Sequence, residues 1–397
     1  MTFDEIVAPL DAAAFHRDYL GQRPLHLQGD PLKWDRVMNW ELLNRLLAMN
    51  TIWSAASLLL VLDKEQLPVT AYASVASGRD GGQVLRPDPV RVRAFLKRGA
   101  TLVLNDIDQL TPDLSAFARA MERALGGKVQ ANLYMSSKRK QGFRVHFDYH
   151  DVFAVHVMGE KTWMVYEGRE ESPITHPRFT SLTQEYKDKA KGELWKEVRM
   201  RPGDLLYLPR GQYHYALADD SPCAHIAFGV TYPIGVDVVS WLFEQTVAEP
   251  LGRQNLPRGD AKALAARLAD IGDWIAGLLR ESKAVEALAA FERNFHWQRE
   301  TYDLPGLIES ADEQWHVRRR GMKLVEQGGR FGLTKEGTRQ AVEVPGAIVP
   351  LVKWTLQRDG FARQEIATAF SDQSEQVDRF IADMARMGLL EAASSGG

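Results

Sequence analysis

The chain has 397 residues, of which 45% are hydrophobic and 25% are charged, and its formal net charge is −3. This is the composition of a globular protein with room for two or three domains, and it produces no overall field that would attract nucleic acid or an anionic membrane. Because Cys223 is the only cysteine, an internal disulfide and a cysteine-cluster metal site are excluded.

The first 125 residues mix helical and strand patterns. Residues 40–49 have helical apolar spacing, residues 100–108 predict a buried strand, and residues 114–127 predict a helix that ends at a glycine pair. The N-terminal residues are acidic and lack the apolar stretch of a signal peptide. The longest apolar run, 55–62, is far shorter than the roughly 20 residues of a membrane span. We therefore expect a cytoplasmic protein that does not enter a membrane.

Strand patterns dominate from residue 129 to about residue 232. Apolar and polar residues alternate in short runs that glycine and proline separate, without helical patterns between them. This arrangement predicts an antiparallel sandwich or barrel. Within it, residues 142–163, GFRVHFDYHDVFAVHVMGEKTW, combine ionisable side chains with an otherwise apolar strand pattern.

The pattern becomes helical after Pro233. Apolar residues occur at the spacing of one helix face at Leu264, Leu268, Ile271, Ile275 and Leu278. Three further helices are expected at 346–357, 363–370 and 374–387, in an order that suits a winged-helix module. A basic triplet, Arg318-Arg319-Arg320, precedes them, but residues 344–397 contain five basic and seven acidic residues. We therefore expect a protein-contact or structural role for this module, and direct nucleic-acid binding is not expected.

His146 and Asp148 are the first candidate metal ligands. Residues i and i+2 of a strand project from the same face, so this imidazole and this carboxylate can converge on one point. His214 follows a Gly-Asp turn, a strand and a Pro-Arg-Gly turn, and could complete the set from a neighbouring strand. Two histidines and one carboxylate form the facial triad of non-haem Fe(II) oxygenases, which leaves coordination positions open.

Lys161 strengthens this interpretation. It lies 13 residues after Asp148, in Gly159-Glu160-Lys161, where a hairpin turn would bring the next strand back beside the metal strand. A lysine at that place could hold an acidic cosubstrate by its distal carboxylate.

Residues 132–166 and 203–217 resemble the JmjC 2-oxoglutarate oxygenases, most closely the ribosomal oxygenase branch of protein hydroxylases, and residues 15–29 resemble the family's N-terminal segment. The resemblance implies an α+β fold with a double-stranded β-helix (cupin/JmjC barrel) core and flanking helices. An α-helical region and a C-terminal winged-helix domain would follow this core. The expected domains are a catalytic domain at 1–235, a helical dimerisation region at 236–305 and a winged-helix-like domain at 306–397.

The resemblance also implies site residues. His146, Asp148 and His214 would bind Fe(II), while Lys161 and Asn132 would contact 2-oxoglutarate, with O2 as the third reactant. The family often has a small hydroxyl residue where Val230 aligns, and Thr231 is adjacent. Three residues near the expected metal site could line the substrate entrance, or could be a solvated strand end and a turn-orienting residue: Tyr149, Asp151 and Arg210. Trp163 is assigned no catalytic role, and the roles of three further histidines stay open: His150, His156 and His225.

The implied activity is hydroxylation of a protein side chain, with arginine or histidine of a ribosomal protein as the first candidate, by a homodimeric enzyme. An oxygenase acting on a peptide natural-product precursor or a small molecule is one alternative. Two others are a non-catalytic cupin and winged-helix binding module, and a metal-dependent isomerase or hydrolase that would give Lys161 no cosubstrate to hold.

Overall fold

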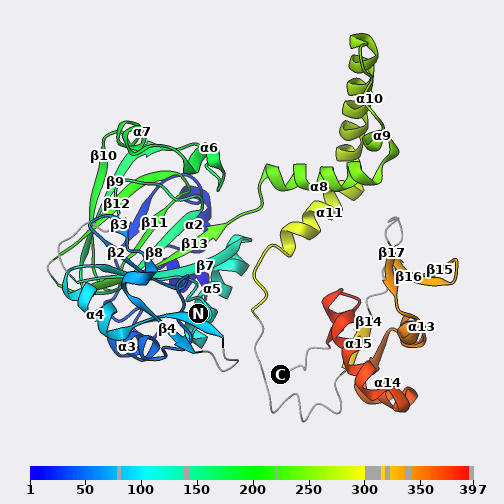
Figure 1. The fold of residues 1–397 in the computed structure, drawn as a ribbon, viewed down its shortest axis with the longest axis horizontal. Helices are drawn as coiled ribbons and strands as arrows, with labels where there is room; N and C mark the ends of the chain where they lie inside the picture. The colour runs from blue at the N-terminus through cyan, green and yellow to red at the C-terminus, as the bar shows by residue number, and fades with distance from the viewer. Residues whose placement is uncertain are drawn as a thin grey trace. The chain divides into compact units, whose positions relative to one another are not determined.

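The computed structural model describes residues 1–77, 82–137, 143–219, 221–299, 314–317, 322–335 and 341–392. The chain divides into two units, Met1–Arg299 and Glu300–Gly397 (Figure 1). Each unit has its own apolar core. The Arg318-Arg319-Arg320 triplet lies outside the described residues. The division of the first unit near residue 235 stays a prediction.

The N-terminal part of the first unit supplies helices that pack on its sheets. They are α1 (Phe3–Val7), α2 (Ala12–Asp18), α3 (Trp40–Ala48), α4 (Pro89–Lys97) and α5 (Pro112–Leu125). The Thr111 side chain accepts a hydrogen bond from the backbone of Leu114 and so caps α5 at its N-terminus. Gly126, with a φ of 67°, ends the helix in the left-handed conformation. The helix predicted at 114–127 and the strand predicted within 100–108 are both present, the latter as β6 (Thr101–Leu104).

Two antiparallel sheets form the centre of this unit. The larger sheet has eight strands in the order β1-β11-β8-β13-β7-β6-β2-β3. Their bounds are β1 (Leu25–Leu27), β11 (Leu205–Leu208), β8 (Asp151–Met158), β13 (Cys223–Thr231), β7 (Lys128–Ser136), β2 (Leu58–Leu62) and β3 (Glu65–Gln66), together with β6. The smaller sheet has the order β10-β9-β12 and consists of β10 (Leu194–Met200), β9 (Lys161–Arg169) and β12 (Gln212–Ala218). Val152 and Ala154 of the larger sheet share one buried cluster with Trp163 and Val165 of the smaller sheet, so the sheets pack face to face.

Smaller elements lie between these strands. They are η1 (Val69–Ala71), the hairpin of β4 (Ala73–Ser77) and β5 (Gln83–Pro87), α6 (Pro177–Thr180) and α7 (Gln184–Ala190).

The turn between β8 and β9 carries the chain from one sheet to the other. β8 pairs with β11 on one side and β13 on the other, so both of its edges are occupied. β9 pairs with β10 and β12 instead. The predicted hairpin that would bring Lys161 back beside the His146 strand is therefore wrong. Gly159 makes this tight change of sheet with a φ of 67°, and a Cβ there would lie 2.2 Å from the carbonyl oxygen of Pro222.

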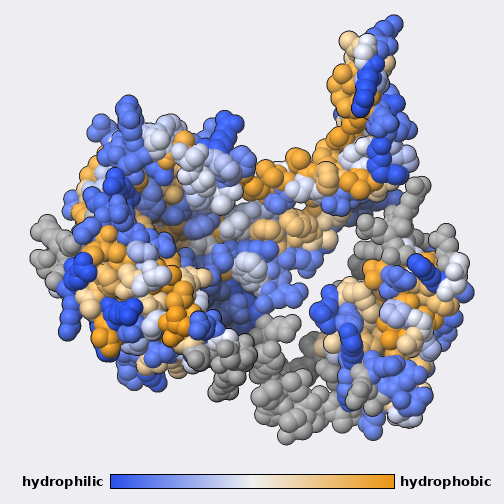
Figure 2. Space-filling model, in the orientation of Figure 1, coloured by the Kyte–Doolittle hydropathy of each residue, from blue (hydrophilic) through white to orange (hydrophobic). Residues whose placement is uncertain are grey.

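Four helices follow the sheets: α8 (Gly235–Ala248), α9 (Pro250–Arg253), α10 (Ala261–Arg280) and α11 (Ser282–Arg293). α8 contacts α9, and α10 contacts α11. Ala284 is the only buried residue of these described helices. Apolar side chains are exposed along them (Figure 2): Val236, Val239, Phe243, Val247, Leu268, Leu279, Val285 and Phe291. None of the helices in the described part of the chain is long and apolar enough to cross a membrane.

The segment after α11 returns to the sheets and is held there by buried charges. The side chain of Arg299 is 3% exposed, and its guanidinium group donates to the carboxylates of Asp108 and Glu122 and to the carbonyl oxygen of Val129. The Lys128 ammonium lies 4.6 Å from the ring centre of Phe295 and 4.7 Å from that of Trp297. These contacts fix where the helices α8–α11 end against α5 and β7.

The described residues of the second unit form two small sheets and three α-helices. Its strands are β14 (Gln314–Val317), β15 (Met322–Gln327), β16 (Arg330–Lys335), β17 (Ala341–Val344), β18 (Gly360–Ala362) and β19 (Leu390–Ala392). The sheet orders are β18-β14-β19 and β15-β16-β17. The three predicted helices are confirmed as α13 (Val349–Leu356), α14 (Arg363–Ala369) and α15 (Ser374–Arg386), with short 3-10 turns at η2 (Gly346–Ile348) and η3 (Ser371–Gln373). They enclose a core that includes Leu351, Ile366 and Phe380.

Candidate metal centre

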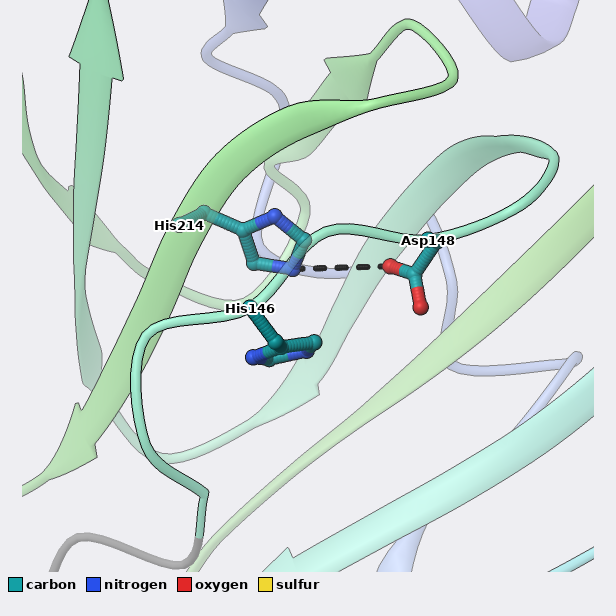
Figure 3. A group of neighbouring side chains, drawn as sticks. All are labelled: His146, Asp148 and His214. Atoms are coloured by element: carbon teal, nitrogen blue, oxygen red, sulfur yellow. Dashed lines mark ion pairs between the residues drawn. The ribbon is translucent and has the colours of Figure 1, made fainter. Parts of the chain in front are cut away.

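The side chains of His146, Asp148 and His214 converge (Figure 3). One nitrogen or oxygen atom from each lies within 4.8 Å of those of the other two. The Nε2 atom of His214 is 3.5 Å from the Oδ2 atom of Asp148. The two imidazole ring centres are 4.4 Å apart. The three candidate ligands that the sequence pattern indicates are therefore brought together.

Backbone pairing holds the two histidines side by side. His146 and His214 exchange hydrogen bonds in an isolated antiparallel bridge, with N–O distances of 3.0 and 2.9 Å. The amide of Gly211 donates to the carbonyl oxygen of Asp148 at 3.0 Å. Residues 143–150 thus precede β8 and contain one bridge, so the prediction that His146 and Asp148 lie on a continuous strand is wrong. The segment pairs with the residues around β12 only at these points.

Hydrogen bonds at the far side of each ring select the metal-binding nitrogen. The Nδ1 atom of His146 lies 2.8 Å from the carbonyl oxygen of Arg144, and that of His214 lies 2.9 Å from the carbonyl oxygen of Gln212. A carbonyl oxygen only accepts, so each Nδ1 carries a proton, and Nε2 is the nitrogen left to face a metal ion. Burial lowers the pKa of His214 to about 4, which keeps this ring neutral at pH 7.

The carboxylate of Asp148 stays ionised in this setting. Burial alone would raise its pKa, but the neighbouring His146 and His214 outweigh burial and hold the pKa below the usual value. Two neutral imidazoles and one carboxylate match the donor set of a divalent transition metal that keeps open coordination positions. The residues present therefore fit a metal ion such as Fe(II).

Lys161 is buried on the strand that pairs with the His214 strand. It lies opposite Ala218 of β12, four residues along from His214, and is 6% exposed. Its ammonium makes no hydrogen bond or ion pair with any residue that the structure describes. Burial lowers the pKa of Lys161, because the charged form loses its hydration. A buried, unpaired ammonium is expensive, so this position calls for an anionic ligand.

Asn132 lies on β7, opposite Ala227 of β13, and is half-buried. Its side-chain oxygen accepts a hydrogen bond from the backbone of Asp106 at 3.1 Å, which fixes the amide group. At the position where the family often has a hydroxyl residue, Val230 is buried and Thr231 is exposed.

The three expected substrate-entrance residues have different surroundings. Tyr149 is half-buried, with its ring edge-on to Phe147 at 5.5 Å. Asp151 is buried at the start of β8, where its carboxylate accepts from the Tyr207 hydroxyl at 2.6 Å and from the backbone of Arg210 at 2.8 Å. The carboxylate of Asp151 is thus occupied within the fold, and through it Arg210 is tied to β8.

Two polar side chains to which the sequence assigned no role, Trp163 and His225, lie in the same interior. The indole of Trp163 stacks on the ring of His214 at 5.6 Å and lies edge-on to His225 at 5.1 Å. His225 in turn stacks on Tyr134 at 5.0 Å. The even spacing of Lys161 and Trp163 along one strand was the available signal, because it places both on one face.

The other two histidines left open have clear contacts. The Nε2 atom of His156 lies 2.9 Å from the carbonyl oxygen of Gly159, at the turn between the sheets. The ring of His150 lies against the backbone of Gly229, where a Cβ would be 2.6 Å from its Cε1 atom. Glycine at 229 therefore makes room for the imidazole of His150.

Residues 104–238 match the family described as the JmjC domain. This segment is a JmjC domain. The β-sheet core with its covering helices is accordingly the JmjC/cupin fold that the sequence predicts.

Curated relatives match more than half of the chain. A Drosophila persimilis protein named bifunctional lysine-specific demethylase and histidyl-hydroxylase NO66 is 25% identical over 232 residues, which are 57% of this chain and 31% of that protein. Ribosomal oxygenase 1 of Gallus gallus is 30% identical over 226 residues, 56% of this chain and 35% of that protein. The chain thus spans about a third of the length of each of these two relatives.

A solved structure resembles the chain over nearly its whole length. The structure of YcfD, a ribosomal oxygenase from Escherichia coli, in complex with cobalt and succinic acid, aligns with a TM-score of 0.50 and 16% identity. The alignment covers 97% of this chain and 99% of that one. At this identity the likeness is one of fold.

Proposed function

We propose that the protein is an Fe(II)- and 2-oxoglutarate-dependent oxygenase that hydroxylates a side chain of another protein. One observation carries the proposal: a site of two histidines and one carboxylate includes His214 of β12, and the neighbouring strand β9 carries a buried lysine that has no counter-ion among the described residues. The metal ligands alone would suit several reactions. The lysine adds the need for an anionic second ligand, which a metal hydrolase or isomerase does not supply.

His146, Asp148 and His214 would hold the iron. Their two neutral nitrogens and single negative charge would leave the metal with one net positive charge and with open positions for other ligands. Bound Fe(II) would supply the oxidative chemistry, with 2-oxoglutarate as the cosubstrate that is oxidised to succinate and carbon dioxide. The protein's part is to bind, orient and exclude water.

Lys161 would bind the distal carboxylate of 2-oxoglutarate, and Asn132 would be a second contact. Pairing with this carboxylate would give the Lys161 ammonium the counter-ion that the described residues do not provide. The apolar walls at Val165 and Val198 would keep bulk water away from the pair and so strengthen it.

The proposed substrate is a protein, by similarity to the curated relatives. The histidyl-hydroxylase and ribosomal oxygenase names support a protein substrate, with arginine or histidine of a ribosomal protein as the first candidate. Tyr149 and Arg210 are candidates for the substrate side of the site, whereas Asp151 would act by fixing the start of β8. A peptide precursor or a small molecule would appear as the better substrate in a competition assay if this assignment were wrong.

Replacing Lys161 with methionine tests the cosubstrate assignment. A charge-assisted hydrogen bond contributes about 1.5–3 kcal/mol, so the KM for 2-oxoglutarate should rise roughly 10- to 150-fold. The ligand-free protein should be as stable as wild type or more stable, because the variant removes a buried unpaired charge. Steady-state kinetics and thermal melting measure the two effects. Lys189→Met, which changes an exposed lysine of α7, is the control. An unchanged KM for 2-oxoglutarate in Lys161→Met would show that Lys161 does not bind the cosubstrate.

We also propose that the helices α8–α11 form a homodimer. Eight large apolar side chains of these helices are exposed in a single copy: Val236, Val239, Phe243, Val247, Leu268, Leu279, Val285 and Phe291. A large exposed apolar surface usually marks an interaction site. A second copy of the same helices is the partner proposed, because an apolar stripe meeting its own copy buries both faces at once.

We predict that the Phe243→Glu variant associates into dimers more weakly than wild type. Phe243 is 65% exposed on α8. Burying such a side chain contributes about 1.5–3 kcal/mol, and a buried carboxylate in its place costs more. We expect the dissociation constant to rise at least about 100-fold, measured by sedimentation. Glu244→Gln, one residue along, should leave the dimer intact. A wild-type protein that is monomeric at micromolar concentration would rule out this interface.

For the second unit, we propose a winged-helix-type module with a protein-contact or structural role. The order β18, α14, α15, β19 and the sheet β18-β14-β19 support this. The acidic balance of residues 344–397 supports a role other than binding nucleic acid.

A cytoplasmic location of the protein is also proposed, and the single cysteine supports it.

A further inference from the structure

Two buried polar atoms near the metal centre lack partners. The Nε1 atom of Trp163 and the Nδ1 atom of His225 make no hydrogen bond with the residues that the structure describes. Each side chain belongs to a residue that is only 4% exposed. An indole nitrogen can only donate, so the N–H of Trp163 needs an acceptor. Buried polar atoms are nearly always paired in folded proteins, so neighbouring exceptions indicate a missing ligand. The Nδ1 atom of His156, on β8 opposite His225, is a third unpaired atom among the described residues.

Strand pairing locates Trp163 between the lysine and the metal ligands. Lys161 and Trp163 are two residues apart and share the face of β9 that looks into the barrel. Their partners on β12 are Ala218 and Ala216, followed on the same face by His214. Both partners have short side chains, so β12 contributes little bulk beside Lys161 and Trp163.

His225 approaches the same space from the other sheet. It lies opposite Tyr134 of β7 on β13, and its ring is edge-on to that of Trp163. The indole of Trp163 also stacks on His214. One unbroken set of ring contacts therefore runs from the His214 ligand through Trp163 to His225, and both unpaired nitrogens belong to it.

We propose that Trp163 and His225 are two further contacts of the dicarboxylate cosubstrate, donating from Nε1 and Nδ1 to its carboxylate oxygens. This inference rests on the proposed function and deepens it. A carboxylate accepts several hydrogen bonds, and a single ammonium satisfies only part of that capacity. Trp163 and His225 would supply neutral donors, which orient the carboxylate without adding a second charge to the barrel.

Calorimetry of 2-oxoglutarate binding to the full chain tests the two proposed contacts. The metal site is loaded with Zn(II) and oxygen is excluded, so that no turnover occurs. Trp163→Phe keeps an aromatic ring and removes the N–H, so the dissociation constant should rise roughly 2- to 13-fold, the effect of one neutral hydrogen bond. His225→Ala should weaken binding similarly, and His225→Asn, which keeps a donor near the place of Nδ1, should restore most of it. Zinc affinity should stay within twofold in every variant. The exposed Trp195 of β10 provides the matched control, Trp195→Phe.

A second measurement observes the indole N–H directly in the wild-type protein. In the wild-type protein labelled with 15N-tryptophan, one indole N–H signal should shift when 2-oxoglutarate binds, and the Trp163→Phe spectrum identifies it. Binding of 2-oxobutyrate, which lacks the distal carboxylate, shows whether that carboxylate is the acceptor. Its affinity should then be equal in wild type and Trp163→Phe.

The outcomes separate this inference from the proposed function. If Lys161→Met weakens binding, but Trp163→Phe and His225→Ala stay within twofold of wild type and no indole signal moves, the two contacts are absent and a water molecule serves these nitrogens. If Lys161→Met also leaves 2-oxoglutarate binding unchanged, the proposed cosubstrate site itself is wrong, and with it the proposed function.

Discussion

The Asp148→Ala protein is expected to lose its metal ion and its turnover of 2-oxoglutarate together. Asp148 is the only anionic group in the cluster with His146 and His214. Without it, two neutral imidazoles face a divalent cation, and they do not replace the lost Coulomb attraction. Loss of a residue that merely orients a ligand already weakens metal binding about 10- to 100-fold, so loss of the charged ligand itself should exceed roughly 100-fold.

Metal content after dialysis and the absorption spectrum of the Co(II) form measure this effect. Asp270→Ala, an exposed carboxylate on α10, is the matched control and should bind metal like wild type. Asp148→Asn separates charge from shape, because it keeps an oxygen donor but no negative charge. Equal metal content in Asp148→Ala and wild type would mean that the ion binds elsewhere.

The second large effect is expected on stability, in Arg299→Met. The variant leaves the buried carboxylates of Asp108 and Glu122 without the guanidinium that both contact. Removing one partner of a buried ion pair costs about 3–5 kcal/mol, because the remaining charge stays out of water. The free energy of unfolding, from urea titration of the full chain, should fall by this amount.

Two comparisons interpret that loss. Arg293→Met removes an exposed arginine only six residues away and should change stability by less than about 0.5 kcal/mol. The triple variant Asp108→Asn, Glu122→Gln, Arg299→Met replaces the whole charged group by neutral side chains and should recover a large part of the loss. A single variant as stable as wild type would show that water, not Arg299, compensates the two carboxylates.

The sequence was sufficient to predict that the three candidate metal ligands converge, because their chemistry is local. His146 and Asp148 are two residues apart, and an extended backbone brings such side chains to one side whether or not a regular strand forms. His214 was found from the turns that flank it. The structure adds what a sequence does not contain, namely the backbone bridge between His146 and His214.

Lys161 was found for a partly wrong reason. Alternation of apolar and polar residues records which face a side chain lies on, but it does not record which strand lies alongside. Both edges of β8 are occupied, so β9 joins the other sheet and reaches the site beside β12. Pairing partners of this kind depend on the whole barrel and could not be deduced from residues 148–161.

The remaining features depend on long-range packing. Arg299 is 191 residues from Asp108, and no local pattern distinguishes it from an exposed arginine. Trp163 and His225 resemble ordinary core residues until their hydrogen bonds are counted in three dimensions. The sequence predicted the apolar stripe of α10 from its helical spacing. It did not predict that residues of this stripe, such as Leu268, are exposed in a single copy of the chain.

Succinate formation from 2-oxoglutarate by the purified full chain, with Fe(II), ascorbate and O2, tests the central claim most directly. The assay compares wild type with Asp148→Ala, without substrate and with ribosomal proteins added. We predict iron-dependent succinate that ribosomal protein increases and that Asp148→Ala abolishes. Wild-type protein that binds iron at this site and yet forms no succinate under any of these conditions would contradict the assignment as an oxygenase.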